Sequence, residues 1–255
     1  MKNIILLGMF IVLSACASKE TQIAEYLKKN PKAVFDVIED NPEQFVEVVN
    51  RAARKAQENR QEKQYSEMKK QQEEQLKNPL RPELQDSRRL IGDKSAKITI
   101  VEYADFQCPA CGMAHSALKE ILKKYDGKVQ FYYKHFPLDF HPMAEPAAYY
   151  YEAVFKQDRV KARKFYDLVF EKQREMKGVD FLRGVAKKVG ADMNQLAKDV
   201  QSEQVRNLVK QDMSEFEKLG FTGTPVTVIN GVALHGAQPA AEIERIIALT
   251  TVARP

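Results

Sequence analysis

Cysteine is scarce in this 255-residue sequence, as are long hydrophobic runs and any large excess of one charge. Three cysteines are too few for a scaffold held together by disulfide bonds, and their odd number leaves at least one outside a pair. Lys and Arg number 40 against 35 Asp and Glu, and this formal net charge of +5 is too small to predict nucleic-acid binding. The composition, 44% hydrophobic and 29% charged, is that of a globular protein and excludes a collagen, a disordered chain or a polytopic membrane protein.

The first residues predict an export signal. Lys2 precedes an apolar run over residues 4–13, which is too short to span a bilayer. The run ends in Leu-Ser-Ala-Cys, which resembles a bacterial lipobox. That resemblance implies a signal peptide over residues 1–15, lipidation of Cys16 and a membrane anchor made of acyl chains. The alternative is cleavage at the Ala-Cys-Ala phrase of residues 15–17, which would give a soluble protein.

Both alternatives place the mature protein in the bacterial cell envelope, facing the periplasm, where the surroundings are oxidising. Ala17 and Ser18 lack the acidic retention signal of enteric lipoproteins, which by resemblance favours the outer membrane. Cys108 and Cys111 then remain as the pair of thiols able to form a disulfide.

Residues 16–50 are predicted to form short helices that hold copies of the chain together. Asn-Pro occurs at residues 30–31 and again at 41–42, and each pair combines a capping residue with proline at the first helical position. The two helices that begin there repeat the same spacing of apolar residues and carry more apolar surface than a short helix buries alone. The alternative is that they pack against the main domain.

A polar segment separates these helices from the main domain. Residues 51–89 are predicted to form a long solvated helix followed by a linker. Residues 90–250 then alternate strand and helix patterns, which predicts an α/β fold. The predicted strands cover residues 98–103, 129–133, 222–230 and 232–234, the predicted helices 109–124 and 239–249, and a helical insertion about 140–219.

The candidate active site is the Cys-Pro-Ala-Cys phrase at the junction of a predicted strand and helix. Cys108 lies at the helix N-terminus, where free N–H groups and the helix dipole stabilise a thiolate, so we predict that it is the nucleophile. Cys111, one turn later, is predicted to be less exposed and to resolve mixed disulfides. An alternative is a copper or zinc site formed by both cysteines and His115.

Three elements together resemble the DsbA-like branch of the thioredoxin superfamily: Asp-Phe-x-Cys-Pro-x-Cys over residues 105–111, Lys-His-Phe-Pro-Leu over 134–138 and Gly-Thr-Pro over 223–225. The resemblance implies a thioredoxin fold with an inserted helical domain, thiol–disulfide exchange on proteins and no bound organic cofactor. It also implies that Pro225, preceded by Thr224, is a cis-proline that faces the cysteines. A proline in an edge strand is the alternative.

Three further residues follow from this resemblance. The family's buried acid, six residues before the first cysteine, corresponds to Glu102, where it could accept or relay the proton of Cys111. A strand glutamate paired at a sheet edge is the alternative. Lys134 could contribute electrostatically to the site, but we expect it to be a solvated surface lysine. Ala110 stands where the strongly oxidising member of the family carries histidine, so a strong oxidant is not expected.

The N-terminal region resembles that of the suppressor-of-copper-sensitivity thiol isomerases, which implies a homo-oligomer held together by this region. The predicted function is therefore an exported isomerase or reductase that acts on cysteines of envelope proteins, with a membrane protein as its redox partner. A monomeric DsbA-like oxidase and a copper- or zinc-binding envelope protein are the alternatives.

Overall fold

The computed structural model describes residues 19–252, so the predicted signal peptide and the lipidation site Cys16 lie outside the described residues. The chain divides into two compact units after Glu67. The predicted domain limits at residues 50 and 89 remain predictions. The second unit, Met68–Pro255, takes in the end of the polar helix and the linker together with the predicted redox domain.

Three helices form the N-terminal region. We call the part of this region up to residue 67 the leader. Helix α1 covers Lys19–Lys29, α2 covers Pro31–Asp40 and α3 covers Pro42–Lys77. Prolines begin α2 and α3, as predicted. The predicted short helix after Pro42 and the predicted polar helix are one continuous helix, because no glycine or proline interrupts this stretch.

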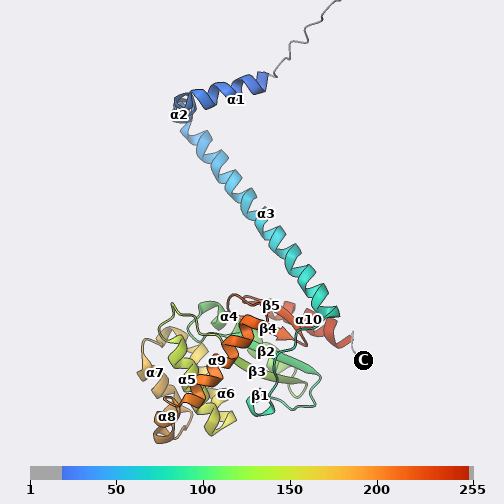
Figure 1. Ribbon diagram of the computed structural model, residues 1–255, viewed down its shortest axis with the longest axis vertical. Coiled ribbons are helices and arrows are strands. Elements are labelled where there is room, and N and C mark those ends of the chain that lie inside the picture. The colour runs from blue at the N-terminus through green and yellow to red at the C-terminus, as the bar shows by residue number, and fades with distance from the viewer. Residues whose placement is uncertain (1–18, 253–255) are drawn as a thin grey trace, which may run out of the picture. The chain divides into compact units, whose positions relative to one another are not determined.

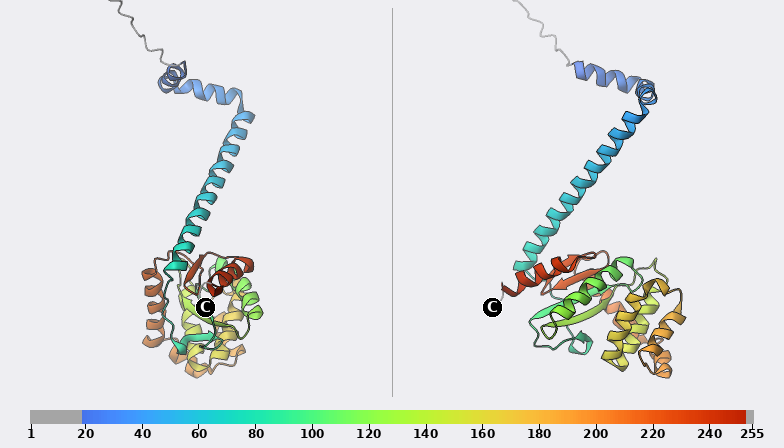
Figure 2. Two further views of the ribbon diagram at one scale, coloured as in Figure 1. Left: turned by 90° about the vertical axis from the view of Figure 1, so that its right-hand side faces the viewer. Right: turned by 180° about the vertical axis from the view of Figure 1, so that it is seen from behind.

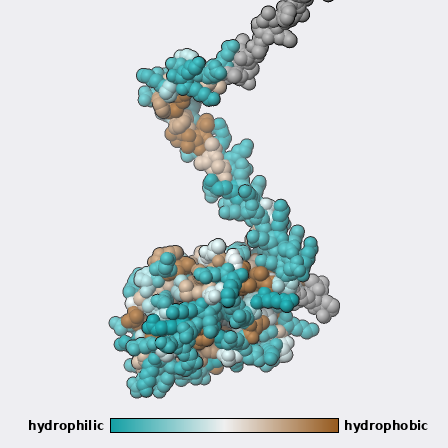
Figure 3. Space-filling model, viewed as in Figure 1, coloured by the Kyte–Doolittle hydropathy of each residue, from teal (hydrophilic) through white to brown (hydrophobic). Residues whose placement is uncertain are grey.

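Apolar side chains remain exposed along the leader. No residue of α2 is buried. Figure 3 shows hydrophobic atoms gathered over α2 and the beginning of α3. We call this surface the leader patch, and its exposed members are Val34, Phe35, Val37, Phe45, Val46, Val48 and Val49.

The second unit is built on a mixed five-stranded sheet in the order β1-β3-β2-β4-β5 (Figure 1). The strands are β1 (Arg89–Ile91), β2 (Ile98–Ala104), β3 (Val129–His135), β4 (Val226–Ile229) and β5 (Val232–His235). Strands β2 and β3 are parallel, and the other pairs are antiparallel. Since β2 is the central strand, nearly all of its side chains are buried, as the apolar pattern predicts.

Helices cover both faces of this sheet (Figure 2). Helices α4 (Pro109–Lys124) and α10 (Ala240–Val252) bury apolar side chains in the cluster that also contains Ile100 and Phe131. On the opposite face, Phe216 of helix α9 (Glu203–Lys218) packs in a second cluster with Val101 and Tyr103.

The helical insertion lies between β3 and β4. It consists of α5 (Ala144–Gln157), α6 (Arg159–Glu171), the 3-10 helix η2 (Gln173–Glu175), α7 (Val179–Lys188), α8 (Met193–Asp199) and α9. The predicted fold class, a thioredoxin fold with inserted helices and a helical leader, is confirmed. Among residues 19–252 there is no helix with the length and apolar character that crossing a bilayer requires.

The end of α3 packs within the second unit. Gln72 is buried and accepts a hydrogen bond of 2.5 Å from Arg245 of α10. The side-chain oxygen of Gln75 accepts a hydrogen bond of 2.8 Å from the backbone N–H of Ala233 in β5. Farther along, Leu80 N–H donates to the carbonyl of Gly231 in the β4–β5 turn at 2.9 Å. These contacts explain why the residues directly after Glu67 belong with the sheet.

Candidate active site

The turn after β2 carries the cysteine pair. Cys108 is the N-cap residue of α4, with Pro109 at the first helical position. Its carbonyl accepts hydrogen bonds from the N–H groups of Cys111 and Gly112 at 3.0 and 3.2 Å, which closes the first helical turn. Cys108 is 7% exposed and Cys111 is completely buried, so Cys111 is the less accessible thiol, as predicted.

The two thiols differ strongly in acidity. A hydrogen bond donated by the Cys111 thiol is the largest of the effects that lower the pKa of Cys108 to about 5, and it outweighs the opposing effect of burial. Burial raises the pKa of Cys111 far above its ordinary value, because a thiolate there would lose its solvation. Cys108 is therefore the thiolate at neutral pH, and Cys111 stays protonated behind it.

The segment that leads into β4 lies against the cysteines. The Thr224-Pro225 peptide bond is cis, and the Cys108 thiol lies 3.9 Å from the carbonyl oxygen of Thr224. The Thr224 side chain also lowers the pKa of both thiols. Pro225 directly precedes β4, which lies between β2 and β5, so the interpretation of an edge-strand proline is wrong.

Glu102 lies in the centre of β2 and is fully buried. The Tyr166 hydroxyl of α6 donates a hydrogen bond of 2.6 Å to Glu102 Oε2, while Oε1 has no partner among the described residues. Burial raises the pKa of this carboxyl to about 8, so it is protonated at neutral pH. The alternative of a glutamate at the sheet edge is wrong, since β2 is flanked by β3 and β4.

Lys134 is not the solvated surface lysine that we expected. Its side chain is buried, forms an ion pair with Glu215 of α9 and lies 5.7 Å from the centre of the Tyr103 ring. Because side chains alternate along a strand, Lys134 points to the face covered by α9, whereas its neighbour Tyr133 belongs to the cluster on the α4 face. Lys134 thus contacts the α9 side of the sheet.

Two polar side chains fasten the cysteine turn to the loop after β3. The buried carboxylate of Asp105 accepts hydrogen bonds from the N–H groups of Gln107 and Leu138, at 2.7 and 3.2 Å, and pairs with His141 Nδ1 at 2.6 Å. The side-chain oxygen of Gln107 accepts a hydrogen bond of 2.6 Å from the N–H of Met143. These contacts hold the cysteine turn against the loop after β3.

The arrangement around His115 does not fit a metal site with the cysteines. His115 Nε2 pairs with Asp167 Oδ1 at 2.9 Å, and its ring stacks on Phe170 with centres 5.2 Å apart. Among residues 19–252, Cys108, Cys111 and His115 do not form a group of three neighbouring ligand atoms. His115 is a packing residue with a carboxylate partner.

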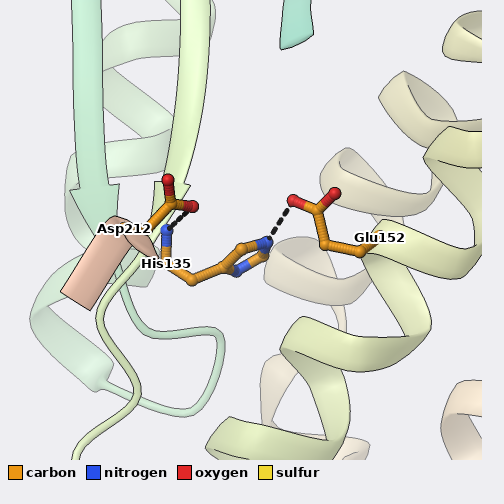
Figure 4. A group of neighbouring side chains, drawn as sticks. All are labelled: His135, Glu152 and Asp212. Carbon is orange, nitrogen blue, oxygen red and sulfur yellow. Dashed lines mark hydrogen bonds and ion pairs between the residues drawn. The ribbon is translucent and has the colours of Figure 1, made fainter. Parts of the chain in front are cut away.

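Another cluster does bring three ligand-type side chains together: His135, Glu152 and Asp212 (Figure 4). The guanidinium of Arg88 already pairs with both of its carboxylates, with contacts of 2.6 Å to Glu152 and 2.6 and 2.9 Å to Asp212. His135 completes the network through a contact of 2.9 Å to Glu152. All four side chains are largely enclosed, so this cluster is a buried ionic network.

Several of these partners could not be predicted from local sequence patterns. Asp105 falls inside the Asp-Phe-x-Cys-Pro-x-Cys element, so its position was visible but its role was not. Tyr166 falls inside the predicted helical insertion, and Arg88 lies in the predicted linker. Their partners lie 64 or more residues away along the chain, beyond the reach of local patterns.

Known proteins share this fold. A thioredoxin family model matches residues 84–248. The chain belongs to the thioredoxin family. It is 31% identical over 150 residues to the probable disulfide bond formation protein D of Bacillus cereus, covering 55% of this chain and 69% of that protein. The structure of oxidised BdbD from Bacillus subtilis superposes with a TM-score of 0.59 at 22% identity, covering 68% of this chain and 98% of the other.

These matches confirm the DsbA-like resemblance and the enzyme class, a thiol–disulfide oxidoreductase. The chain is also 34% identical over 146 residues to the Na(+)/H(+) antiporter NhaA 3 of Salinispora tropica, which covers 57% of this chain. It spans only 22% of the length of that protein. The similarity therefore concerns a part of the antiporter.

Proposed function

We propose that this thiol–disulfide oxidoreductase works as an isomerase or reductase on cysteines of envelope proteins. One observation carries the thiol–disulfide exchange in this proposal: the Cys108 thiolate lies at a helix start, with the fully buried Cys111 thiol directly behind it. The thiolate is the form that attacks disulfides, and a pKa of about 5 keeps Cys108 in this form at neutral pH. No organic cofactor takes part in this chemistry.

The exchange proceeds in two balanced steps. The Cys108 thiolate attacks a substrate disulfide, so that a mixed disulfide forms while the substrate S–S bond breaks and one substrate thiolate leaves. Cys111 then passes its proton to the substrate thiolate freed in the first step and attacks the Cys108 sulfur, which forms the Cys108–Cys111 disulfide and releases the second substrate thiolate. In isomerisation the freed substrate thiolate instead attacks the mixed disulfide, and reduced enzyme is recovered.

In the proposed direction, electrons pass from the enzyme to its substrates, and isomerisation involves no net transfer. Isomerisation and reduction both require a reduced enzyme that carries the Cys108 thiolate, so a membrane protein that supplies electrons is the expected redox partner. Ala110 supplies no side-chain donor to that thiolate beyond the backbone, which favours this direction over strong oxidation. The roles assigned to Thr224 and Pro225 are to line the approach to Cys108 and to position the bound substrate.

The leader and the N-terminal cysteine extend the proposal to location and assembly. We infer that lipidation of Cys16 anchors the protein to the envelope membrane, preferably the outer membrane, on the periplasmic side. The leader patch joins copies into a homo-oligomer, since exposed apolar surface of this kind is costly in water. Several Cys108 sites then act on one misfolded substrate. Loss of acyl labelling in Cys16→Ser, with release from the membrane fraction, tests the anchor.

The central experiment traps the substrates. Cys111→Ala should accumulate mixed disulfides with envelope proteins through Cys108, because the resolving thiol is gone. Cys108→Ala, which removes the attacking sulfur and keeps Cys111, serves as the matched control and should trap none. The wild type should also restore activity to a scrambled disulfide-containing substrate. Equal trapping by both variants, or trapping by neither, would contradict the assigned roles.

A further inference from the structure

A glutamine from the helical insertion contacts the cysteine turn directly. Gln173 is the first residue of η2, which follows α6. Its side-chain Nε2 donates hydrogen bonds to the carbonyl oxygens of Phe106 and Cys108, at 2.9 and 2.8 Å. One amide group thus uses both of its N–H bonds on the two residues that bracket Gln107, at the entry to α4.

The fit around this amide is specific. Both partners are carbonyl oxygens, which can only accept, so the NH₂ group must face them and Oε1 must face away. Oε1 lies over Gly112, where an added Cβ would come within 2.9 Å of it. No other donor among the described residues reaches the Phe106 carbonyl, and this residue is 1% exposed. Gln173 therefore satisfies a buried acceptor that the local backbone leaves unpaired.

The surrounding packing brings the insertion to the same place. Phe170, at the end of α6, packs against the ring of Phe106 with centres 4.9 Å apart. Asp105 and Gln107 hold the other side of the turn through the loop after β3. Polar side chains thus hold the cysteine turn on two sides. Of these side chains, Gln173 is the one that bonds to the backbone of Cys108.

We propose that Gln173 is a positioning residue for Cys108, through which the helical insertion sets the reactivity of the redox pair. This inference rests on the proposed exchange function. The positive end of the amide lies at the carbonyl of the nucleophilic residue, where it adds to the field of the helix N-terminus that favours the thiolate. It also fixes the turn so that the Cys108 sulfur stays within reach of the Cys111 thiol and of Thr224.

The test compares Gln173→Glu with Gln157→Glu in the full chain, with Cys16→Ser in every sample so that Cys108 and Cys111 are the only thiols. Gln157 is a matched control because its side chain also bridges backbone groups, the N–H and carbonyl of Asp192, at a place outside the cysteine turn. The readouts are the pH midpoint of Cys108 alkylation and the reduction potential of the pair. A role limited to holding the fold would leave both readouts unchanged.

Gln173→Glu places a carboxylate against two carbonyl oxygens and near the thiolate, so the alkylation midpoint should rise by about one pH unit. At pH 5, the alkylation rate should then fall about fivefold. The reduction potential should become more negative, since the reduced form is stabilised less. Gln157→Glu should leave both values at those of the wild type.

Gly112→Ala provides a second variant, which leaves the Gln173 residue itself unchanged. Alanine favours a helix more than glycine does, but its Cβ would lie 2.9 Å from Gln173 Oε1, so the Gln173 amide must shift. This variant should shift the midpoint in the same direction as Gln173→Glu. Wild-type values in both Gln173→Glu and Gly112→Ala would overturn the positioning role. A wild-type protein without exchange activity and with an ordinary Cys108 pKa would instead overturn the proposed function.

Discussion

The Tyr166 hydroxyl donates a hydrogen bond of 2.6 Å to Glu102 Oε2, and both residues are fully buried. Tyr166 comes from the helical insertion and Glu102 from the central strand, so the bond joins the two parts of the redox domain. Its effect lowers the pKa of Glu102, but burial prevails and leaves a protonated acid. The sheet therefore holds a proton on the face where Cys111 is also buried.

Replacing this acid should change how stability depends on pH. The pKa of Glu102 is about 8 in the folded protein against an ordinary 4.5, so between these pH values the native state holds a proton that the unfolded state releases. Stability from this residue is complete below pH 4.5 and is lost as pH rises to 8. With both proteins oxidised, the free energy of unfolding of Glu102→Gln relative to that of the wild type should therefore increase by about 1.4 kcal/mol per pH unit across this range.

Urea unfolding at several pH values measures this gain, and the oxidised proteins remove the titration of the thiols. Glu145→Gln is the matched control, because Glu145 also accepts a hydrogen bond from a tyrosine, Tyr149, but is exposed. Its stability relative to the wild type measures the cost of losing a hydrogen bond between a carboxylate and a tyrosine. Parallel pH curves for wild type and Glu102→Gln would contradict a buried, protonated Glu102.

The acidity of Cys108 predicts selective modification. In reduced Cys16→Ser protein, iodoacetamide at neutral pH should modify Cys108 first, because Cys111 is fully buried and its pKa is raised. The rate should rise with pH around a midpoint of about 5, as the Cys108 thiol ionises. Mass spectrometry of the labelled peptide identifies the site. Labelling of Cys111 first, or a midpoint near pH 9, would refute the assignment.

The buried ionic network predicts a large loss of stability in Arg88→Met. The variant leaves the carboxylates of Glu152 and Asp212 enclosed without their cation, which costs on the order of 3–5 kcal/mol at neutral pH. Arg88 lowers the pKa of Glu152, so its loss raises that pKa, and the deficit should shrink near pH 4 where the carboxyls are protonated. Urea unfolding at pH 7 and pH 4 measures both effects.

Arg183→Met controls for the loss of an arginine, since Arg183 pairs with Asp180 on an exposed surface and should contribute less than about 1 kcal/mol. Equal, small losses in the two variants would show that the buried network does not need Arg88.

The leader patch predicts the assembly state. Phe35→Asp combined with Phe45→Asp places two charges on the exposed apolar surface and should convert an oligomer to monomers in sedimentation. Disulfide reductase activity should persist, while most isomerase activity on a scrambled substrate should be lost. Val160→Asp, at an exposed apolar position of α6, is the control and should keep the oligomer. A monomeric wild type would remove the assembly role and favour the monomeric oxidase.

Local patterns predicted the elements next to the cysteines well. Residues 109–124 form α4 as predicted, because proline starts the helix and an Asp-Gly pair follows soon after it ends. The strand predicted over 222–230 is shorter, since β4 begins only after the cis Thr224-Pro225 bond. Strand β1 was missed because three residues, Arg89–Ile91, are too few to show a period.

The cysteine pair, Thr224, Pro225 and Glu102 could be located from motifs, but their polar neighbours could not. Gln173 acts through two backbone carbonyls, which leave no trace in side-chain patterns. Lys134 was misjudged because a lysine in a strand is usually solvated, and its half-buried partner Glu215 lies 81 residues farther on. Such pairings depend on tertiary packing, which local spacing does not encode.

The turn between β4 and β5 packs against the segment that follows α3. Gly231 has a φ of +87°, and an added Cβ would lie 2.5 Å from the Pro79 Cβ and 2.8 Å from the Leu80 carbonyl oxygen. This contact and those of Gln72 and Gln75 all involve residues after Glu67, within the second unit. The contacts that anchor α3 to the sheet therefore do not involve the leader. The leader can thus diverge, lengthen or be exchanged during evolution, independently of the second unit.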